Sequence, residues 1–534
     1  MEDADYVIVG GGSAGAVLAN RLSADGKYKV VLLEGGPKDK NPAIHIPFGL
    51  TVITHMKKII TGFETVPQPF VDGRTMYQPR GTTLGGSSSV NAMCYIRGDS
   101  SDYDEWAEMG AVGWGWDEVL PYFRKAEDNS RGADDWHGEG GPLGVSDLRH
   151  VSSLTDDYVE AGGEIQIPYT DDFNGPDREG LGVYQVTQRG GQRCSTAKGY
   201  LTDEVKARQN LKIETGAKVL RILMDEGRAT GVEYRVGSDV RTQKARAEVL
   251  LCAGTFGTPH LLMLSGIGPA VSLKEAGVTP VLDMPGVGQN LQDHLDAHLT
   301  YRIETHAGYA NSFRFFARMA PEPLKYATKR EGVLSSNIAE GGGFVKSSPD
   351  AEKPDLQFHF IPSILVDHGR KKEWGHGFTF HVCLLYPDSR GEVSLRSADP
   401  DEAPLIDPRY LSDPRDLPRM RAGYRLCQRI ADAPSLKKHA PHPREAQTGA
   451  ETDEEIDALV RQTAETVYHP IGTCRMGTDD EAVVTPALKV RGVDGLRVVD
   501  ASVMPRIIGG NTNAPTVMIA EKAADMILAD ARGA

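Results

Sequence analysis

The sequence predicts an α/β protein with two sheets, one mainly parallel and one antiparallel. An apolar run followed by a glycine turn opens the chain at residues 6–15, and a short apolar strand returns at residues 496–500. Between about 297 and 465, strands with alternating polar and apolar residues dominate. Parallel strands are buried on both faces and read as continuous apolar runs, whereas half-buried antiparallel strands alternate. A parallel domain with a second, antiparallel domain flanked by helices is therefore expected.

Composition excludes several classes of protein. The 534 residues are 40% hydrophobic and 25% charged, as in folded globular chains. The net charge of −15 and the lack of a Lys/Arg cluster argue against a nucleic-acid partner. The six cysteines form no Cys-x-x-Cys pair, so we expect reduced thiols and no metal site. With no signal peptide and no transmembrane segment, a cytoplasmic protein is expected; peripheral contact at the inner face of the cell membrane stays open.

The N-terminal segment has the pattern of a dinucleotide site. Residues 6–9 predict a buried strand, residues 10–15 (including Ser13 and Ala14) a glycine turn, and residues 16–19 the start of a helix. Gly10 permits the tight turn, Gly12 lets a pyrophosphate approach the backbone, and Gly15 lets the helix pack on the sheet. The positive end of the helix dipole favours the phosphates. A glycine turn in an unrelated α/β protein is the alternative.

A carboxylate supports the dinucleotide interpretation. Glu34 ends the second predicted strand, nineteen residues after Gly15. An acid at this point accepts hydrogen bonds from a ribose diol and repels a 2′-phosphate, so NADP is disfavoured. The motif by itself does not separate FAD from NAD. A second glycine-rich segment, residues 80–91, predicts a buried loop whose N–H groups face a flat or anionic ligand.

Four segments together match one family pattern: the N-terminal turn, residues 85–91, residues 254–268, and His469-Pro470 combined with residues 511–515. The chain resembles the glucose-methanol-choline (GMC) family of FAD-dependent oxidoreductases over essentially its whole length. Within the family it looks most like the choline dehydrogenase and medium-chain alcohol dehydrogenase branch. The resemblance implies a Rossmann-like FAD-binding domain of residues 1–145, 191–296 and 470–534. Residues 146–190 and 297–469 would form the substrate-binding cap.

The resemblance also implies the cofactor contacts. The FAD pyrophosphate would lie on Gly10, Gly12 and Gly15, and its ribose on Glu34. Further expected cofactor-binding residues are Ser13, Ala14, Arg80, Gly85, Gly86, Asn91, Ala92, Met93, Val219, Ala253, Asp500, Ala501, Asn511 and Thr512. Some members of the family carry a histidine before the Asn91 position that bonds covalently to the flavin. Val90 stands there in this chain, so FAD is expected to be held non-covalently.

Oxidising an alcohol requires a base for the hydroxyl proton and a donor that holds the oxygen. A near-neutral imidazole suits the first role, and the resemblance assigns it to His469. Asn513 is the preferred donor, with Asn511 as the competing choice. His294 is interpreted as structural and Cys474 as a packing residue.

The expected function is oxidation of a primary alcohol, aliphatic or aromatic, to the aldehyde, with hydride transfer to flavin N5. Electrons would pass to a quinone-type acceptor. An oxygen-using alcohol oxidase, a choline dehydrogenase and a flavin-containing hydroxynitrile lyase are the alternatives. Apolar side chains of the cap would either line the substrate site or belong to the core: Phe358, Phe360, Ile361 and Ile364.

Overall fold

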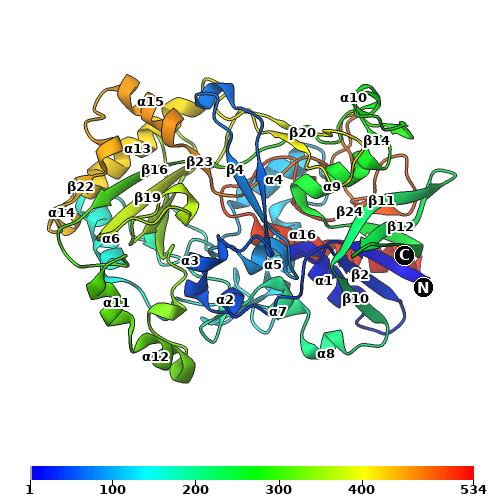
Figure 1. Ribbon diagram of the computed structural model, residues 1–534, viewed down its shortest axis with the longest axis horizontal. Helices are drawn as coiled ribbons and strands as arrows, with labels where there is room; N and C mark the ends of the chain where they lie inside the picture. Colours follow the sequence, from blue (N-terminus) through cyan, green and yellow to red (C-terminus); the bar gives the residue numbers. More distant parts are fainter. Residues whose placement is uncertain (1–2, 534) are drawn as a thin grey trace.

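The computed structural model describes residues 3–533 and contains two large sheets (Figure 1). The first sheet has the order β10-β2-β1-β13-β12-β11, with β24 paired to β13. The second has the order β22-β16-β19-β18-β17-β7, with β23 paired to β16. The prediction of an α/β fold with one mainly parallel and one antiparallel sheet is confirmed.

The first sheet is parallel at its centre and ends in an antiparallel meander. Pairs between β1, β2, β10, β13 and β24 are parallel, whereas β11-β12 and β12-β13 are antiparallel. Every residue of β2 is buried, as its unbroken apolar run predicts. The strands are β1 (Ala4–Val9), β2 (Val30–Glu34), β10 (Leu211–Thr215), β11 (Ala217–Asp225), β12 (Arg228–Val236), β13 (Asp239–Leu251) and β24 (Leu496–Val498).

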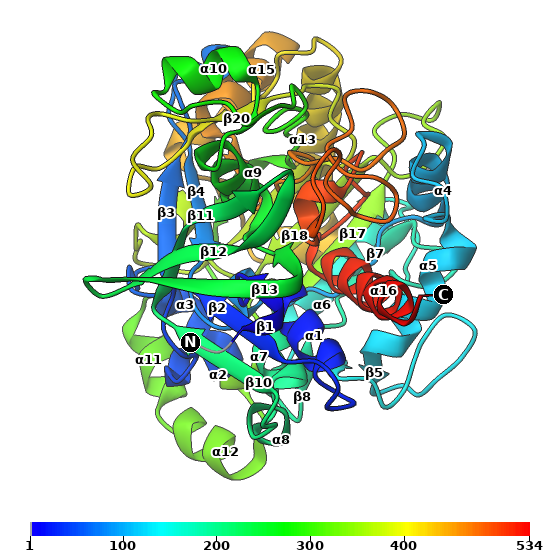
Figure 2. The same cartoon turned by 90° about the vertical axis from the view of Figure 1, so that its right-hand side faces the viewer.

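Helices from both ends of the chain meet beside this sheet. Figure 2 shows the C-terminal helix α16 next to α1, and the two helices contact one another. The helices associated with this part are α1 (Ser13–Leu22), α4 (Ser100–Glu108), α5 (Trp116–Ala126), α7 (Thr196–Tyr200), α8 (Asp203–Lys206), α9 (Gly254–Leu264), α10 (Ala270–Glu275) and α16 (Asn513–Arg532). A proline in the sequence predicts a terminal helix that begins only after Pro515; α16 instead begins at Asn513, about one turn earlier, because proline is tolerated in the first turn of a helix.

The second sheet is antiparallel, and its two faces differ. Phe358 and Phe360 of β18 are fully buried in a core that includes residues of α6 and α13. Gln357 and His359, the neighbours of Phe358 along β18, point to the opposite face, because side chains alternate along a strand. The strands are β7 (Gly180–Val183), β16 (Leu295–Arg302), β17 (Gly341–Val345), β18 (Leu356–Ile361), β19 (Gly377–Leu384), β22 (His442–Pro443) and β23 (Glu465–Thr466).

Helices α6, α13 and α15 cover the apolar face of the second sheet. Tyr158 of α6 stacks on Phe360, with ring centroids 4.4 Å apart. The helices of this part are α6 (Ser153–Glu164), α11 (Phe313–Met319), α12 (Glu322–Lys329), α13 (Asp416–Asp432), α14 (Pro434–Lys437) and α15 (Asp453–Thr463). No helix in residues 3–533 combines the length and the apolar character needed to cross a membrane.

Short elements fill the connections. The small strands are β3 (Ile60–Glu64), β4 (Tyr77–Gly81), β5 (Glu127–Asn129), β6 (Leu143–Val145), β8 (Gln188–Arg189), β9 (Gln192–Arg193), β14 (Ile267–Gly268), β15 (Leu282–Asp283), β20 (Glu392–Ser394) and β21 (Leu405–Asp407). The short helices are α2 (Pro42–His45), α3 (Leu50–Ile53), η1 (Pro47–Gly49), η2 (Pro69–Val71), η3 (Gly86–Ser89), η4 (Val333–Ser335), η5 (Asp367–Gly369), η6 (Glu445–Gln447) and η7 (Ala501–Val503). The division of the chain into the five segments given above stays a prediction.

Candidate active site

The turn between β1 and α1 forms a cradle of backbone. Gly10 has φ +102°, and a Cβ there would lie 2.4 Å from the carbonyl oxygen of Cys252. A Cβ at Gly15 would lie 1.9 Å from the Gly10 oxygen. Gly12 caps α1 without any side-chain hydrogen bond, so the N–H groups of the first turn are open to an anion.

Glu34 lies at the carboxyl end of β2 and is buried beside this turn. Its two carboxylate oxygens accept hydrogen bonds from the backbone N–H groups of Gly11 and Gly36, each at 2.7 Å. Burial raises the pKa of the Glu34 carboxyl, and the two hydrogen bonds oppose that shift. Each carboxylate oxygen keeps a further lone pair, so the side chain can still accept a hydrogen bond from a hydroxyl group.

The second glycine-rich segment lies directly against the first. Gly85 donates its N–H to the Gly11 oxygen at 2.7 Å, and a Cβ at Gly86 would lie 2.8 Å from the Cα of Gly12. Both Gly85 and Gly86 have positive φ, +86° and +53°. The structure thus brings together two segments that are about seventy residues apart in the sequence.

A buried cation lies beside this segment. Arg193 donates to the carbonyl oxygens of Ile44 and Ser88 and, at 2.8 Å, to Oδ1 of Asn91. Its Nη2 has no hydrogen-bond partner among the described residues, and no carboxylate there influences its pKa. Burial lowers the pKa of the guanidinium to about 9. An uncompensated buried cation, an uncapped helix and a glycine cradle fit an anionic dinucleotide.

The other expected cofactor residues lie in several places. Asp500 follows β24, and its Oδ2 accepts from the N–H of Gly254 at 2.9 Å, next to Ala253. The Ala501 oxygen accepts from the N–H of Gly472. Val219 lies in β11 against the core of the first sheet. Ala92 and Met93 follow Asn91, and Arg80 donates from Nη2 to the Tyr468 oxygen at 2.7 Å. Their roles as cofactor contacts stay predictions.

His469 is buried and lies between two side chains. Its Nδ1 is 3.0 Å from Nδ1 of His294, and its Nε2 is 3.1 Å from Nδ2 of Asn511. The His469 N–H donates to Oδ1 of Asp293 at 2.9 Å. The histidine is therefore fixed at its backbone and at both ring nitrogens.

The hydrogen bonds of His294 decide which nitrogen of His469 carries a proton. Nε2 of His294 is 2.9 Å from the Leu385 carbonyl oxygen, which can only accept, so this nitrogen carries the hydrogen. Burial lowers the pKa of His294 to about 4, so the ring is neutral and its Nδ1 is a bare acceptor. His469 must then donate from Nδ1. Burial, followed by His294, lowers the pKa of His469 well below 6.5, which leaves its Nε2 unprotonated.

The structure pairs Asn511 with His469 and places Asn513 elsewhere. Oδ1 of Asn511 accepts from Nε2 of Gln357 at 3.0 Å, so its Nδ2 faces His469. Oδ1 of Asn513 accepts from the Ser13 hydroxyl at 2.8 Å, in the first turn of α1. Thr512 lies between them as the cap of α16. The preference for Asn513 as the partner of His469 is therefore not supported by the geometry.

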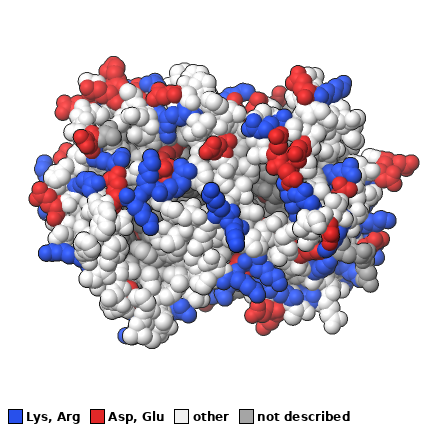
Figure 3. All heavy atoms as spheres, viewed as in Figure 1, with Lys and Arg blue, Asp and Glu red and all other residues white. Residues whose placement is uncertain are grey.

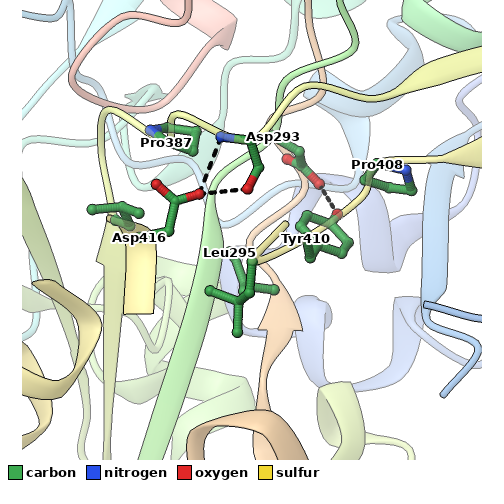
Figure 4. Close-up of a pocket in the computed structure, with 9 residues that line it drawn as sticks. Asp293, Leu295, Pro387, Pro408, Tyr410 and Asp416 are labelled. Carbon is green, nitrogen blue, oxygen red and sulfur yellow. Dashed lines mark hydrogen bonds between the residues drawn. The ribbon is translucent and has the colours of Figure 1, made fainter. Parts of the chain in front are cut away.

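A small cavity of about 10 Å³ lies beside Asp293, the residue that accepts the backbone N–H of His469 (Figure 4). Asp293 borders it, and its Oδ2 accepts from the hydroxyl groups of Tyr410 and, at 2.6 Å, Thr466. Burial raises the pKa of Asp293. A cavity of this volume holds about one water molecule and is too small for a substrate. Because Asp293 also accepts the N–H of His469, we interpret the cavity as part of the packing that supports His469.

Sequence reasoning missed a polar row on the second sheet. His298 of β16, His381 of β19 and His359 of β18 are register neighbours across three strands. Nδ1 of His381 forms an ion pair with Oδ2 of Asp296. Four atoms in this row have no hydrogen-bond partner in the described chain: Asp296 Oδ1, His298 Nδ1, His359 Nδ1 and His381 Nε2. Only the alternation in each strand could have indicated a shared face, because strand order is not visible in the sequence.

In this polar row the charged groups are His381 and Asp296. Burial lowers the pKa values of His298 to about 4 and of His359 to about 3, so both rings are neutral near pH 7. For His381, burial is outweighed by Asp296, and its pKa is raised above 6.5. For Asp296, burial is outweighed by His381, and its pKa is lowered. Since Phe358 and Phe360 lie on the other face, this side of the sheet is polar and those two residues are core.

The chain is similar to known proteins over almost its whole length. Residues 4–296 and 387–520 match two domain models described as GMC oxidoreductase. The chain is 49% identical to an alcohol dehydrogenase [acceptor] from Pseudomonas putida, over 98% of this chain and 95% of that protein. It is 42% identical to an oxygen-dependent choline dehydrogenase from Vibrio vulnificus, over 98% and 94%.

A solved structure extends the similarity to the fold. The crystal structure of pyridoxine 4-oxidase from Mesorbium loti superposes with a TM-score of 0.88 at 32% identity, covering 98% of this chain and 99% of that one. The predicted resemblance is confirmed, and with it the FAD cofactor that the cradle fits. The chain belongs to the GMC oxidoreductase family of FAD-dependent enzymes.

Proposed function

We propose that the protein oxidises a primary alcohol to the aldehyde at His469. One observation carries the proposal: the unprotonated Nε2 of His469 lies 3.1 Å from the amide nitrogen of Asn511. The similarity to an alcohol dehydrogenase [acceptor] at 49% identity supports it. A base and a hydrogen-bond donor side by side are what a hydroxyl group needs when it loses its proton.

In this proposal Nε2 of His469 accepts the hydroxyl proton and Nδ2 of Asn511 donates to the oxygen as negative charge develops there. His294 accepts from Nδ1 of His469 and so stabilises the imidazolium that forms. Gln357 holds the Asn511 amide in the orientation that presents its N–H. FAD, when bound non-covalently, supplies the acceptor for the hydride that leaves the carbinol carbon. We assign Asn513 and Ser13 to the cofactor side of the site.

The polar row bears on the class of alcohol. Unpartnered donor and acceptor atoms on Asp296, His298, His359 and His381 favour a substrate with a second hydrogen-bonding group over a plain hydrocarbon. The Asp296 carboxylate is already neutralised by His381, which disfavours a permanently cationic alcohol such as choline. We propose that the electrons taken from the alcohol pass on to a quinone-type acceptor.

The test is the visible spectrum of the flavoprotein under anaerobic conditions with a panel of primary alcohols. Alkanols, benzyl alcohols, alcohols with a second hydroxyl group, and choline form the panel. We expect the flavin band to bleach, most readily with a neutral alcohol that carries a second polar group. Addition of a soluble quinone should restore the band faster than air. A flavin band that no alcohol bleaches contradicts the proposal, and faster recovery in air assigns an oxidase instead.

A further inference from the structure

One face of the molecule exposes large aromatic side chains that touch one another. Phe313 and Phe316 of α11 are 84% and 50% exposed, and Trp374 is 58% exposed. The two phenyl rings lie 5.3 and 6.1 Å from the Trp374 ring. We call these three residues the aromatic patch. Leu324 of α12, the helix that contacts α11, is 70% exposed as well. Single exposed apolar residues are common, whereas a contiguous cluster marks an interaction site.

The surroundings of the aromatic patch are basic. Residues 313–330 contain five Lys or Arg and one acidic residue, a net charge of +4 in a chain with −15 overall. Arg370, Lys371 and Lys372 precede the Trp374 loop. In the described chain no carboxylate forms an ion pair with the following exposed residues: Arg314, Lys325, Lys329, Lys371 and Lys372. The lower left of Figure 3, where Figure 1 places α11 and α12, is largely without charged groups except at its margin.

We propose that the aromatic patch and its basic rim dock on an anionic lipid bilayer. Aromatic rings favour the membrane interface, and each Lys or Arg near an anionic surface adds attraction. A second copy of this chain is a poorer partner, because a two-fold contact would oppose two faces of the same positive sign. Protein interfaces are also depleted in Lys, which is frequent here.

The docking face continues toward the candidate active site. Nδ1 of His368 forms a hydrogen bond with the Tyr468 hydroxyl, and Tyr468 directly precedes His469. Six residues after His368, Trp374 pairs with Asn311 next to α11. The loop therefore extends from the membrane-facing side to the segment that carries the base. A bilayer in this place suits the exchange of a lipid-soluble electron acceptor.

Vesicle flotation of the purified holoenzyme tests the proposal. One sample contains vesicles of phosphatidylcholine alone and the other equal parts of phosphatidylcholine and phosphatidylglycerol. We expect flotation with the anionic vesicles only, and weaker flotation at high salt. The Arg314→Gln/Lys325→Gln variant should bind roughly fivefold more weakly per basic residue removed. Phe313→Ser/Trp374→Ser should bind at least about tenfold more weakly, because apolar insertion is lost.

Val271→Ser/Lys274→Gln is the matched control. It removes one exposed apolar residue and one positive charge from α10, which Figure 1 places at the opposite end of the molecule. Flavin content and activity with a soluble acceptor report folding in every variant. Failure of the wild type to float, or equal flotation of all variants, overturns the proposal. A wild-type dimer that Phe313→Ser/Trp374→Ser converts to a monomer, without vesicle binding, also overturns it and assigns a protein interface.

Discussion

The protonation state of one imidazole determines whether the site can start the reaction. Burial and the neighbouring His294 keep the pKa of His469 well below 6.5, so its Nε2 is bare at neutral pH. Lowering the pH protonates Nε2, and so removes the base, only when the pH comes close to that lowered pKa. We expect kcat/KM for the alcohol to stay level from neutral pH through 6.5 and to decline only as the pH approaches the lowered pKa, well below 6.5. A pH profile in saturating electron acceptor measures this, and an acid limb centred at or above 6.5 would contradict it.

Asn511 and Asn513 are two positions apart, and we expect their substitution to have different effects. Asn511→Ala should lower the rate of flavin reduction by about 10²- to 10³-fold, because the donor to the developing alkoxide is lost. Asn513→Ala removes the acceptor for Ser13 near the uncapped α1 and should instead weaken FAD retention. Rapid-mixing reduction kinetics and flavin content per protein separate the two. Equal rates for Asn511→Ala and wild type at full flavin content would refute the assignment.

Strands β16, β18 and β19 bring three histidines and an aspartate together. The ion pair of His381 with Asp296 among them affects the stability of the fold. His381→Leu leaves the Asp296 carboxylate buried without its partner, which costs about 3 kcal/mol or more. Adding Asp296→Asn removes the charge and should restore most of that loss. Chemical denaturation of the two single variants and the double variant measures the coupling. Additive effects of the two substitutions would show that the pair does not interact.

The same pair makes stability depend on pH. The raised pKa of His381 contributes stability below its ordinary value of 6.5, and this is lost as the pH rises through the raised value. The lowered pKa of Asp296 contributes stability above its ordinary 3.8, lost as the pH falls through the lowered value. The contribution is therefore largest between about 3.8 and 6.5 and is absent in the double variant.

Local elements could be predicted from the sequence, and contacts between elements could not. The strand, glycine turn and helix at residues 4–22 are encoded within one short segment. The choice between Asn511 and Asn513 depends on where α16 begins, because Asn513 is its first residue and Asn511 lies before its cap, Thr512. The contact of His294, which directly precedes β16, with His469 became visible only in the folded chain. The polar row could be predicted only from the register of three strands, and no local sequence pattern contains that register.

At the scale of the whole molecule, the cofactor site is built from segments far apart in the sequence. Gly86→Ala would place a Cβ 2.8 Å from Gly12 and separate η3 from the β1–α1 turn. We expect this variant to lose FAD and to melt at lower temperature, because FAD stabilises the folded state by mass action. Gly113→Ala is the control, since it also has positive φ but a Cβ there meets no atom within 4 Å. Equal flavin content in the two variants would contradict this account of the cradle.

Anaerobic single-turnover reduction of the bound flavin by the best alcohol is the sharpest check that His469 is the base. His469→Gln keeps a polar side chain of similar reach but offers no basic nitrogen. We expect a flavoprotein with normal FAD content whose reduction is about 10²- to 10⁴-fold slower than in the wild type. Reduction at the wild-type rate in His469→Gln would contradict it and would place the base elsewhere in the site.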